Sequence, residues 1–169
     1  MLKKPKLIAF DLDYTLWPFW VDTHVDPPFR KANKWYSRNG QVVDAQSRKV
    51  KCYKEVPSVL KKLHNEGYVL AVASRTGEID GANQLLKLFD WEKYFTYKEI
   101  YPGSKTTHFQ RIKTKSGIDF SEMLFFDDEH RNKIDLNTIG VLMILVDDGV
   151  TQELIRKGLE NFSEQYGSK

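Results

Sequence analysis

Seven residues that could carry chemistry stand directly after short apolar runs or in the loops that follow them. They are four carboxylates, a hydroxyl, a guanidinium and an ammonium: Asp11, Asp13, Asp127, Asp128, Ser74, Arg75 and Lys105. Four carboxylates gathered in one place repel one another unless a cation lies among them. Such an oxygen-rich site suits a hard metal ion, and magnesium is the usual choice inside cells. The remaining three side chains would supply donors and positive charge for a phosphate.

This set predicts phosphoryl transfer. An ordinary aspartate has a pKa of about 3.9, so Asp11 would be ionised at neutral pH and ready to attack. Magnesium and Lys105 would neutralise the repulsion between this carboxylate and an anionic phosphate. We expect Asp11 to be the nucleophile that forms an aspartyl-phosphate. Asp13 would protonate the leaving oxygen and then activate water.

The elements that must position these residues alternate along the chain. Short apolar runs predict strands at 6–10, 68–73, 94–101, 123–126 and 141–146. Helical spacing of apolar residues predicts helices at 56–65, 82–89, 104–115, 132–139 and 151–165. Alternating strands and helices indicate βαβ units, hence an α/β fold with a parallel sheet and helices on both faces. Ligands bind outside the carboxyl ends of such strands, where the seven residues would meet.

The segment 17–54 breaks this regular pattern. It contains three prolines, and Asn39-Gly40 is a strong signal for a two-residue hairpin. We interpret it as a small flap insertion, so that residues 1–169 form a single domain. Trp17, Phe19 and Trp20 either pack the flap onto the core or form an aromatic wall beside the phosphate site. Such a wall would admit a phosphotyrosine ring or another flat leaving group.

Composition narrows the classes of function. The net charge is +3, from 26 basic and 23 acidic residues, which falls short of a nucleic-acid binder. The one cysteine, Cys52, cannot form an intrachain disulfide and lacks a reactive-thiol signature, so a cysteine phosphatase is excluded. The longest apolar stretch, 141–146, is too short to cross a bilayer, and no signal peptide is evident. We therefore expect a cytoplasmic protein with no membrane partner; neither a monomer nor a dimer is favoured.

The ordered motifs resemble those of the haloacid dehalogenase superfamily. Residues 11–15 resemble its Asp-x-Asp-x-Thr motif, Ser74 and Lys105 its second and third motifs, and Asp127-Asp128 its fourth. Within that superfamily the chain is most similar to the eukaryotic magnesium-dependent phosphatases. The runs that carry this resemblance are 10–28, 73–76, 81–85, 100–105 and 125–129.

The resemblance implies a Rossmann-like core with no large cap domain, Asp11 as nucleophile and Asp13 as acid and base. It implies a Mg²⁺ ion held by the Asp11 carboxylate, the main-chain oxygen of Asp13 and one acid of the fourth motif. Of that acidic pair we favour Asp127 as the direct ligand, with Asp128 acting through water or by holding Lys105. The residues assigned to substrate binding are Leu12, Ser74, Arg75 and Lys105, although Arg75 alone could be a surface charge. The implied substrates are small phosphorylated molecules such as fructosamine 6-phosphates, or phosphotyrosine proteins.

Three alternatives remain open. A receiver-like signalling module also uses aspartate, magnesium, a hydroxyl and lysine, but its acidic pair comes early in the chain and it has no counterpart of Asp13. A phosphatase acting on nucleic-acid ends or phosphoserine would stay within the superfamily, although the weak net charge disfavours nucleic acid. A binding protein that has lost activity is disfavoured because every expected polar residue is present.

Overall fold

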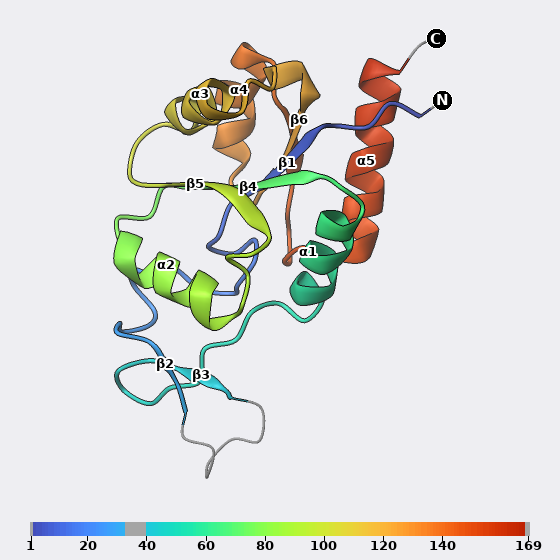
Figure 1. Cartoon of the computed structure of the whole chain (residues 1–169). Coiled ribbons are helices and arrows are strands. Elements are labelled where there is room, and N and C mark those ends of the chain that lie inside the picture. Colours follow the sequence, from blue (N-terminus) through green and yellow to red (C-terminus); the bar gives the residue numbers. More distant parts are fainter. Residues whose placement is uncertain (1, 33–39, 168–169) are drawn as a thin grey trace.

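The computed structural model describes residues 2–32 and 40–167 and is built on one five-stranded parallel sheet (Figure 1). Its order is β5-β4-β1-β6-β7, and every neighbouring pair is parallel. The strands are β1 (Leu7–Phe10), β4 (Val69–Ser74), β5 (Phe95–Ile100), β6 (Met123–Asp127) and β7 (Leu142–Leu145). The predicted α/β fold with a parallel sheet is confirmed, and each predicted strand is present with small changes at its ends.

Helices cover both faces of the sheet because its central strands are buried on both sides. In β1, Ile8 and Phe10 point to one hydrophobic cluster, whereas Leu7 and Ala9 point to the other. The first cluster is shared with α1 (Val56–Asn65), α2 (Ile79–Leu88) and α5 (Gln152–Tyr166). The second is shared with α3 (Lys105–Ser116) and α4 (His130–Ile139). A continuous apolar strand with no polar face is what such two-sided burial requires.

Side-chain caps mark where α3 and α2 begin. The Ser104 side chain accepts a hydrogen bond from Thr106 N, so α3 starts at Lys105 and ends before Gly117, which adopts φ 71°. Helix α2 begins at 79 rather than at the predicted 82, because the Glu78 side chain accepts from Gly81 N and adds a turn of weakly apolar sequence. A 3₁₀ turn, η1 (Phe120–Glu122), precedes β6.

The flap contains a small antiparallel pair, β2 (Arg30–Lys31) and β3 (Val42–Val43). Asn39 of the predicted Asn-Gly turn lies outside the described residues. Buried Asp44 fixes the base of the flap, since it accepts hydrogen bonds from the main chain of Asp26, Gln46 and Arg48. Across residues 2–32 and 40–167, no helix has the length and apolar character that a membrane span needs.

Candidate active site

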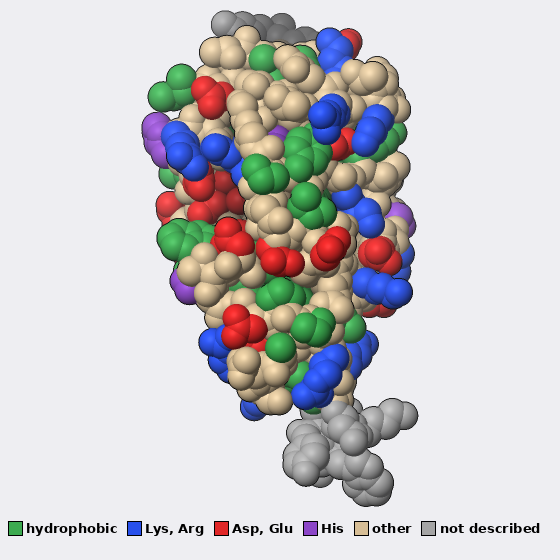
Figure 2. All heavy atoms as spheres, turned by 90° about the vertical axis from the view of Figure 1, so that its left-hand side faces the viewer, with side chains coloured by type: hydrophobic (Ala, Val, Ile, Leu, Met, Phe, Trp, Pro, Cys, Tyr) green, Lys and Arg blue, Asp and Glu red, His purple; other side chains and the backbone are tan. Residues whose placement is uncertain are grey.

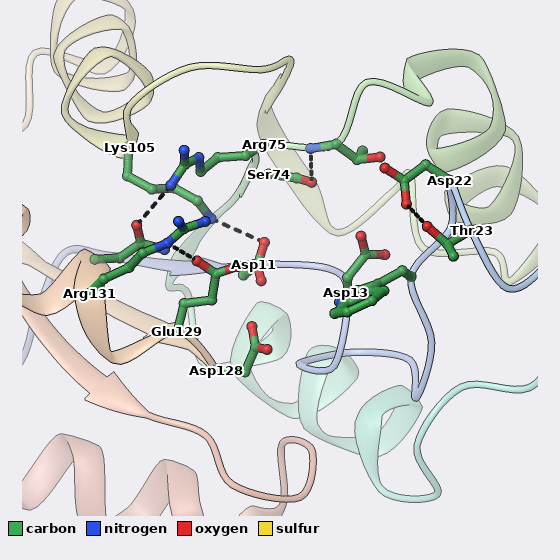
Figure 3. A pocket seen from close by; sticks show the side chains of 13 residues that line it. Asp11, Asp13, Asp22, Thr23, Ser74, Arg75, Lys105, Asp128, Glu129 and Arg131 are labelled. Carbon is green, nitrogen blue, oxygen red and sulfur yellow. Dashed lines mark hydrogen bonds and ion pairs between the residues drawn. The ribbon is translucent and has the colours of Figure 1, made fainter.

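The carboxyl ends of β4, β1 and β6 form the floor of a recess, where acidic side chains gather beside basic ones (Figure 2). Phe10 pairs with Val72 on one side and Phe126 on the other, so Asp11 comes next at the centre of the edge. A cavity of about 320 Å³ opens there (Figure 3). Its lining residues are Asp11, Asp13, Trp20, Asp22, Thr23, Ser74, Arg75, Thr76, Lys105, Asp128, Glu129, Arg131 and Asn132. Six of the seven residues singled out from the sequence thus line one cavity, and Asp127 is buried behind it.

Lys105 is the buried cation of the site, with only 1% of its surface exposed. Its Nζ donates to Ala73 O at 2.6 Å and to Asp11 Oδ1 at 3.1 Å, and lies 3.4 Å from Asp127 Oδ2. Burial opposes a charge here, but the carboxylates of Asp11 and Asp127 outweigh it and raise the pKa of Lys105. Lys105 is therefore an ammonium that joins β1, β4 and β6 and orients the Asp11 carboxylate.

The acidic cluster carries more negative charge than Lys105 can balance. Carboxylate oxygens of Asp11, Asp127 and Asp128 all lie within 4.8 Å of one another. Burial, together with the neighbouring acids, raises the pKa of Asp11 well above its ordinary value even with Lys105 alongside. Burial, with the charge of Asp127 next to it, raises the pKa of Asp128 to about 6. This donor set fits a divalent, oxygen-preferring cation, which would favour the ionised form of each carboxylate.

The two acids of the pair differ in how free their oxygens are. Asp127 Oδ1 accepts from Glu129 N at 3.1 Å, and Oδ2 accepts from Asn132 Nδ2 at 2.7 Å and faces Lys105. Burial opposes its ionisation, but Lys105 and these hydrogen bonds lower the pKa of Asp127. Asp128 instead lines the cavity. Asp128 is therefore the acid that faces the cavity, whereas Asp127, which we favoured from the sequence as the direct ligand, is held by protein groups.

A tight turn after β1 brings Asp13 back over the cavity. Leu12 O accepts from the main-chain N–H groups of 15 and 16, and Tyr14 adopts a left-handed φ of 57°. The turn places Trp17 so that its Nε1 donates to Asp13 Oδ1 at 2.7 Å, and Val21 N donates to the same oxygen at 3.1 Å. Burial raises the pKa of Asp13 against these two hydrogen bonds. Asp13 is thus a held carboxyl group whose Oδ2 stays available for proton transfer.

The residues expected to bind substrate surround Asp11 on the other side. Ser74 is buried and its Oγ accepts from Thr76 N at 3.3 Å. Arg75 is half-buried and lines the cavity, where its Nη1 lies 3.5 Å from Asn132 Oδ1. It therefore belongs to the cavity wall rather than to a remote surface. The Leu12 side chain is fully buried in the core, so only its main chain could contact substrate.

Two structural roles were missed by the sequence reasoning. Asn132, fully buried on the first turns of α4, hydrogen-bonds Asp127 and lies next to Arg75. The sequence feature that could have indicated this role is a polar residue, Asn132, on the inward face of the helix predicted at 132–139. The Trp17 indole was considered only for packing or as an aromatic wall, although tryptophan usually finds an acceptor when buried.

The three aromatic residues after the first motif divide between the two proposed roles. Trp17 and Phe19 are buried and stack at 5.5 Å, and Trp17 also stacks on Trp91. They pack the flap onto the core. Trp20 is 49% exposed, lines the cavity and stacks on His24 at 5.2 Å. Only Trp20 is placed to form an aromatic wall.

Comparison with known proteins agrees with this geometry. A family model for acid phosphatases matches residues 3–165. Human magnesium-dependent phosphatase 1 is 55% identical over 164 residues, which cover 97% of this chain and 90% of the human protein.

Solved structures show the same fold. A Clostridium difficile protein assigned as a phosphatase superposes with a TM-score of 0.64 at 19% identity, covering 92% of each chain. The N-terminal part of a Bacteroides fragilis protein, with a phosphatase domain in complex with Mg, has a TM-score of 0.59 at 18% identity. That alignment covers 91% of this chain and 40% of the other. A Schizosaccharomyces pombe protein of the HAD-like hydrolase superfamily is 40% identical over 149 residues, which cover 83% of this chain and 84% of that protein. The fold, the ordered motifs and the extent of the family match lead to one conclusion: the chain belongs to the magnesium-dependent phosphatase family of haloacid dehalogenase-like hydrolases, and it is a phosphatase.

Proposed function

We propose that this phosphatase hydrolyses phosphate monoesters through an aspartyl-phosphate formed on Asp11, with magnesium as its cofactor. The observation that carries the proposal is the arrangement around Asp11. Lys105 fixes one carboxylate oxygen at 3.1 Å, and Asp13, held by Trp17 and Val21, lines the same cavity. A nucleophile, a counter-charge and a proton donor therefore converge where a phosphate would enter.

The residues that would hold Mg²⁺ are the carboxylates of Asp11 and Asp128 and the main-chain oxygen of Asp13. The close approach of the acidic oxygens and the raised pKa values of Asp11 and Asp128 support this assignment. Bound magnesium would neutralise the cluster and offset the charge of the transferring phosphoryl group. Asp127 would contribute from behind, by keeping Lys105 charged and in place.

In the first step, Asp11 Oδ2 attacks phosphorus while Lys105 holds Oδ1. A bond forms between Oδ2 and phosphorus, and the bond from phosphorus to the leaving oxygen breaks. Asp13, whose pKa is raised by burial, donates a proton to that oxygen. Ser74 Oγ, Arg75 and Lys105 bind the phosphoryl oxygens as charge shifts onto them.

In the second step, Asp13 is ionised and takes a proton from a water molecule. The water oxygen bonds to phosphorus, the bond between Asp11 Oδ2 and phosphorus breaks, and inorganic phosphate leaves. Asp11 returns as a carboxylate and Asp13 returns protonated, so the cycle closes without another reactant. The two donors to Asp13 Oδ1 keep Oδ2 directed for both transfers.

We further propose small phosphorylated molecules or phosphotyrosine side chains as substrates. A cavity of about 320 Å³ has room for a phosphate and one ring or sugar. Trp20, exposed and stacked on His24, offers a flat apolar surface next to Asp22 at that cavity. These features support a phosphotyrosine ring or a fructosamine 6-phosphate in the leaving-group position.

Hydrolysis of p-nitrophenyl phosphate by the wild type and by Asp11→Asn, with magnesium and with EDTA, tests the proposal. We expect magnesium-dependent turnover that is absent in the variant, because a neutral amide is a poor nucleophile. Equal turnover by the two folded proteins would refute Asp11 as the nucleophile. Turnover unaffected by EDTA would refute the magnesium assignment.

A further inference from the structure

His108 is a buried titratable residue beside the active site that has no part in the chemistry above. It lies one helical turn beyond Lys105 on α3, with no exposed surface. Residues three apart lie on the same side of a helix, so His108 supports the segment that carries Lys105. Its ring stacks on the ring of Tyr101 at 4.3 Å, with 14° between the planes. It does not line the cavity, so any effect on the reaction must act through other residues.

The imidazole contacts three main-chain oxygens from separate segments. Nδ1 lies 2.9 Å from Ser104 O, at the start of α3, and Nε2 lies 2.8 Å from both Ser74 O and Tyr101 O. Ser74 ends β4, and Tyr101 begins the loop from β5 to α3. One ring therefore joins the segments that place Ser74 and Lys105 around the phosphate position.

The number of protons on the ring decides whether all three contacts are hydrogen bonds. A carbonyl oxygen only accepts, so both ring nitrogens must carry a proton to donate. A neutral imidazole has one N–H group, which leaves its other nitrogen facing a carbonyl oxygen at 2.8–2.9 Å without a proton between them. Only the imidazolium form donates to all three oxygens.

We propose that His108 is a positioning residue that joins the ends of β4, β5 and the start of α3, and that the join is complete only when both ring nitrogens are protonated. The inference rests on the proposed function, because Ser74 and Lys105 are the groups that the join would align for phosphoryl transfer. When the ring loses its second proton, at least one contact becomes repulsive and the alignment loosens.

The surroundings of the ring set the pH range of this effect. Burial lowers the pKa of His108 and the charge of Lys105 acts in the same direction, whereas the three carbonyl oxygens act against them. The ionisable groups nearest the ring are Lys105, whose charge acts on it, and Tyr101, which stacks on it. Arg111 lies over the Tyr101 ring, and Glu99 acts on the Tyr101 hydroxyl. We therefore expect the doubly protonated ring, and with it all three hydrogen bonds, at pH values below the usual pKa of histidine.

The kinetic test compares wild type with His108→Gln in magnesium at a series of pH values. Glutamine cannot present donors on two opposite sides, so kcat should fall by roughly 10-fold to 100-fold at acid pH, the scale of a small misplacement. The ratio of wild-type to variant kcat should decrease as pH rises through the His108 titration. Taking a ratio cancels titrations that the two proteins share, such as that of Asp13. His64→Gln, on the exposed face of α1, is the matched control and should give a ratio near one throughout.

A second measurement needs neither turnover nor a stable variant, so failure of the join and failure of the proposed reaction can be told apart. In magnesium-loaded wild type labelled with ¹⁵N, the two ring nitrogens of His108 should have similar shifts at acid pH and widely separated shifts at higher pH. The amide signals of Ser74 and Lys105 should move with the same midpoint. A ring that stays singly protonated wherever the protein is folded would overturn the proposal, as would a kcat ratio that does not vary with pH.

Discussion

Replacing Lys105 by methionine removes the buried ammonium while nearly keeping the side-chain volume. In the structure this ammonium faces Asp11 Oδ1 at 3.1 Å and Asp127 Oδ2 at 3.4 Å, and all three groups are buried. The variant would leave two buried carboxylates without their counter-charge. We therefore expect Lys105→Met to reduce the free energy of unfolding as well as activity.

The size of the loss follows from this geometry. Removing one partner of a buried ion pair costs about 3–5 kcal/mol. The lower end applies, because Asp127 keeps its hydrogen bonds from Glu129 N and Asn132. For a domain of this size, each kcal/mol of lost stability lowers Tm by about 2–4 °C. A loss of about 3 kcal/mol therefore corresponds to a fall in Tm of about 6–12 °C.

The loss should also depend on pH. Lys105 lowers the pKa of Asp127 in the folded protein, so the stability from this pairing is present above the unfolded pKa of Asp127. It disappears as pH falls through the lowered folded pKa. In Lys105→Met the orphaned carboxylates of Asp11 and Asp127 should take up protons more readily, and the difference from wild type should shrink from pH 7 towards pH 4.

Urea denaturation of both proteins in EDTA at several pH values measures this difference. Lys98→Met is the control, since Lys98 pairs with Glu92 at the surface. This substitution should lower the free energy of unfolding by less than about 1 kcal/mol. A Lys105→Met loss as small as that of the control would refute the structural role of the ammonium. A loss of constant size across the pH range would refute its pairing with the carboxylates.

Three further predictions concern the reaction. Asp13→Asn should slow turnover by roughly 10²–10⁴-fold, the usual worth of acid–base catalysis, and rapid-quench experiments should find more phosphoenzyme. Because the pKa of Asp128 is raised to about 6, protons should compete with Mg²⁺ below that pH. Titration calorimetry should then show affinity falling by up to about tenfold per pH unit, as expected when one proton is displaced. Trp20→Ala should raise KM for aryl phosphates more than for alkyl phosphates, because only a flat leaving group can stack on the exposed indole.

Each of these has a clear contrary result. A wild-type rate in folded Asp13→Asn would remove that residue from the mechanism. Magnesium affinity that does not change between pH 7 and pH 5 would contradict Asp128 as a ligand. Equal losses on aryl and alkyl phosphates in Trp20→Ala would contradict the aromatic wall, and Ile134→Ala, another exposed apolar position outside the cavity lining, should affect neither.

The positions of the strands could be predicted because their signal is local. Uninterrupted apolar runs can be buried on both faces only within a covered parallel sheet, and the structure confirms this fold. Polar residues immediately after those runs then fall at one edge by register, which brings Asp11, Ser74 and Asp127 close together. Helix α1 matches its predicted bounds, since a proline near its start and a glycine after its end mark it in the sequence.

Features that depend on contacts between distant residues could not be predicted in this way. Adjacent aspartates at 127 and 128 look alike in sequence, and only Asn132 and Lys105 distinguish the buried one. Trp17 and Trp20 are three residues apart in the sequence, yet Trp17 is buried in the core and Trp20 is exposed. The cytoplasmic location and the absence of a nucleic-acid partner stay predictions, because no feature of the fold or of the site tests them.

Trapping the covalent intermediate tests the central claim most directly. Asp13→Asn should be mixed with magnesium and p-nitrophenyl phosphate, quenched in acid, reduced with borohydride, and analysed by peptide mass spectrometry. An acyl phosphate on Asp11 would be reduced to homoserine at position 11, and we predict that product only when magnesium and substrate are both present. Phosphate on another residue, or no modification of Asp11 in a variant that still turns over, would contradict the aspartyl-phosphate mechanism.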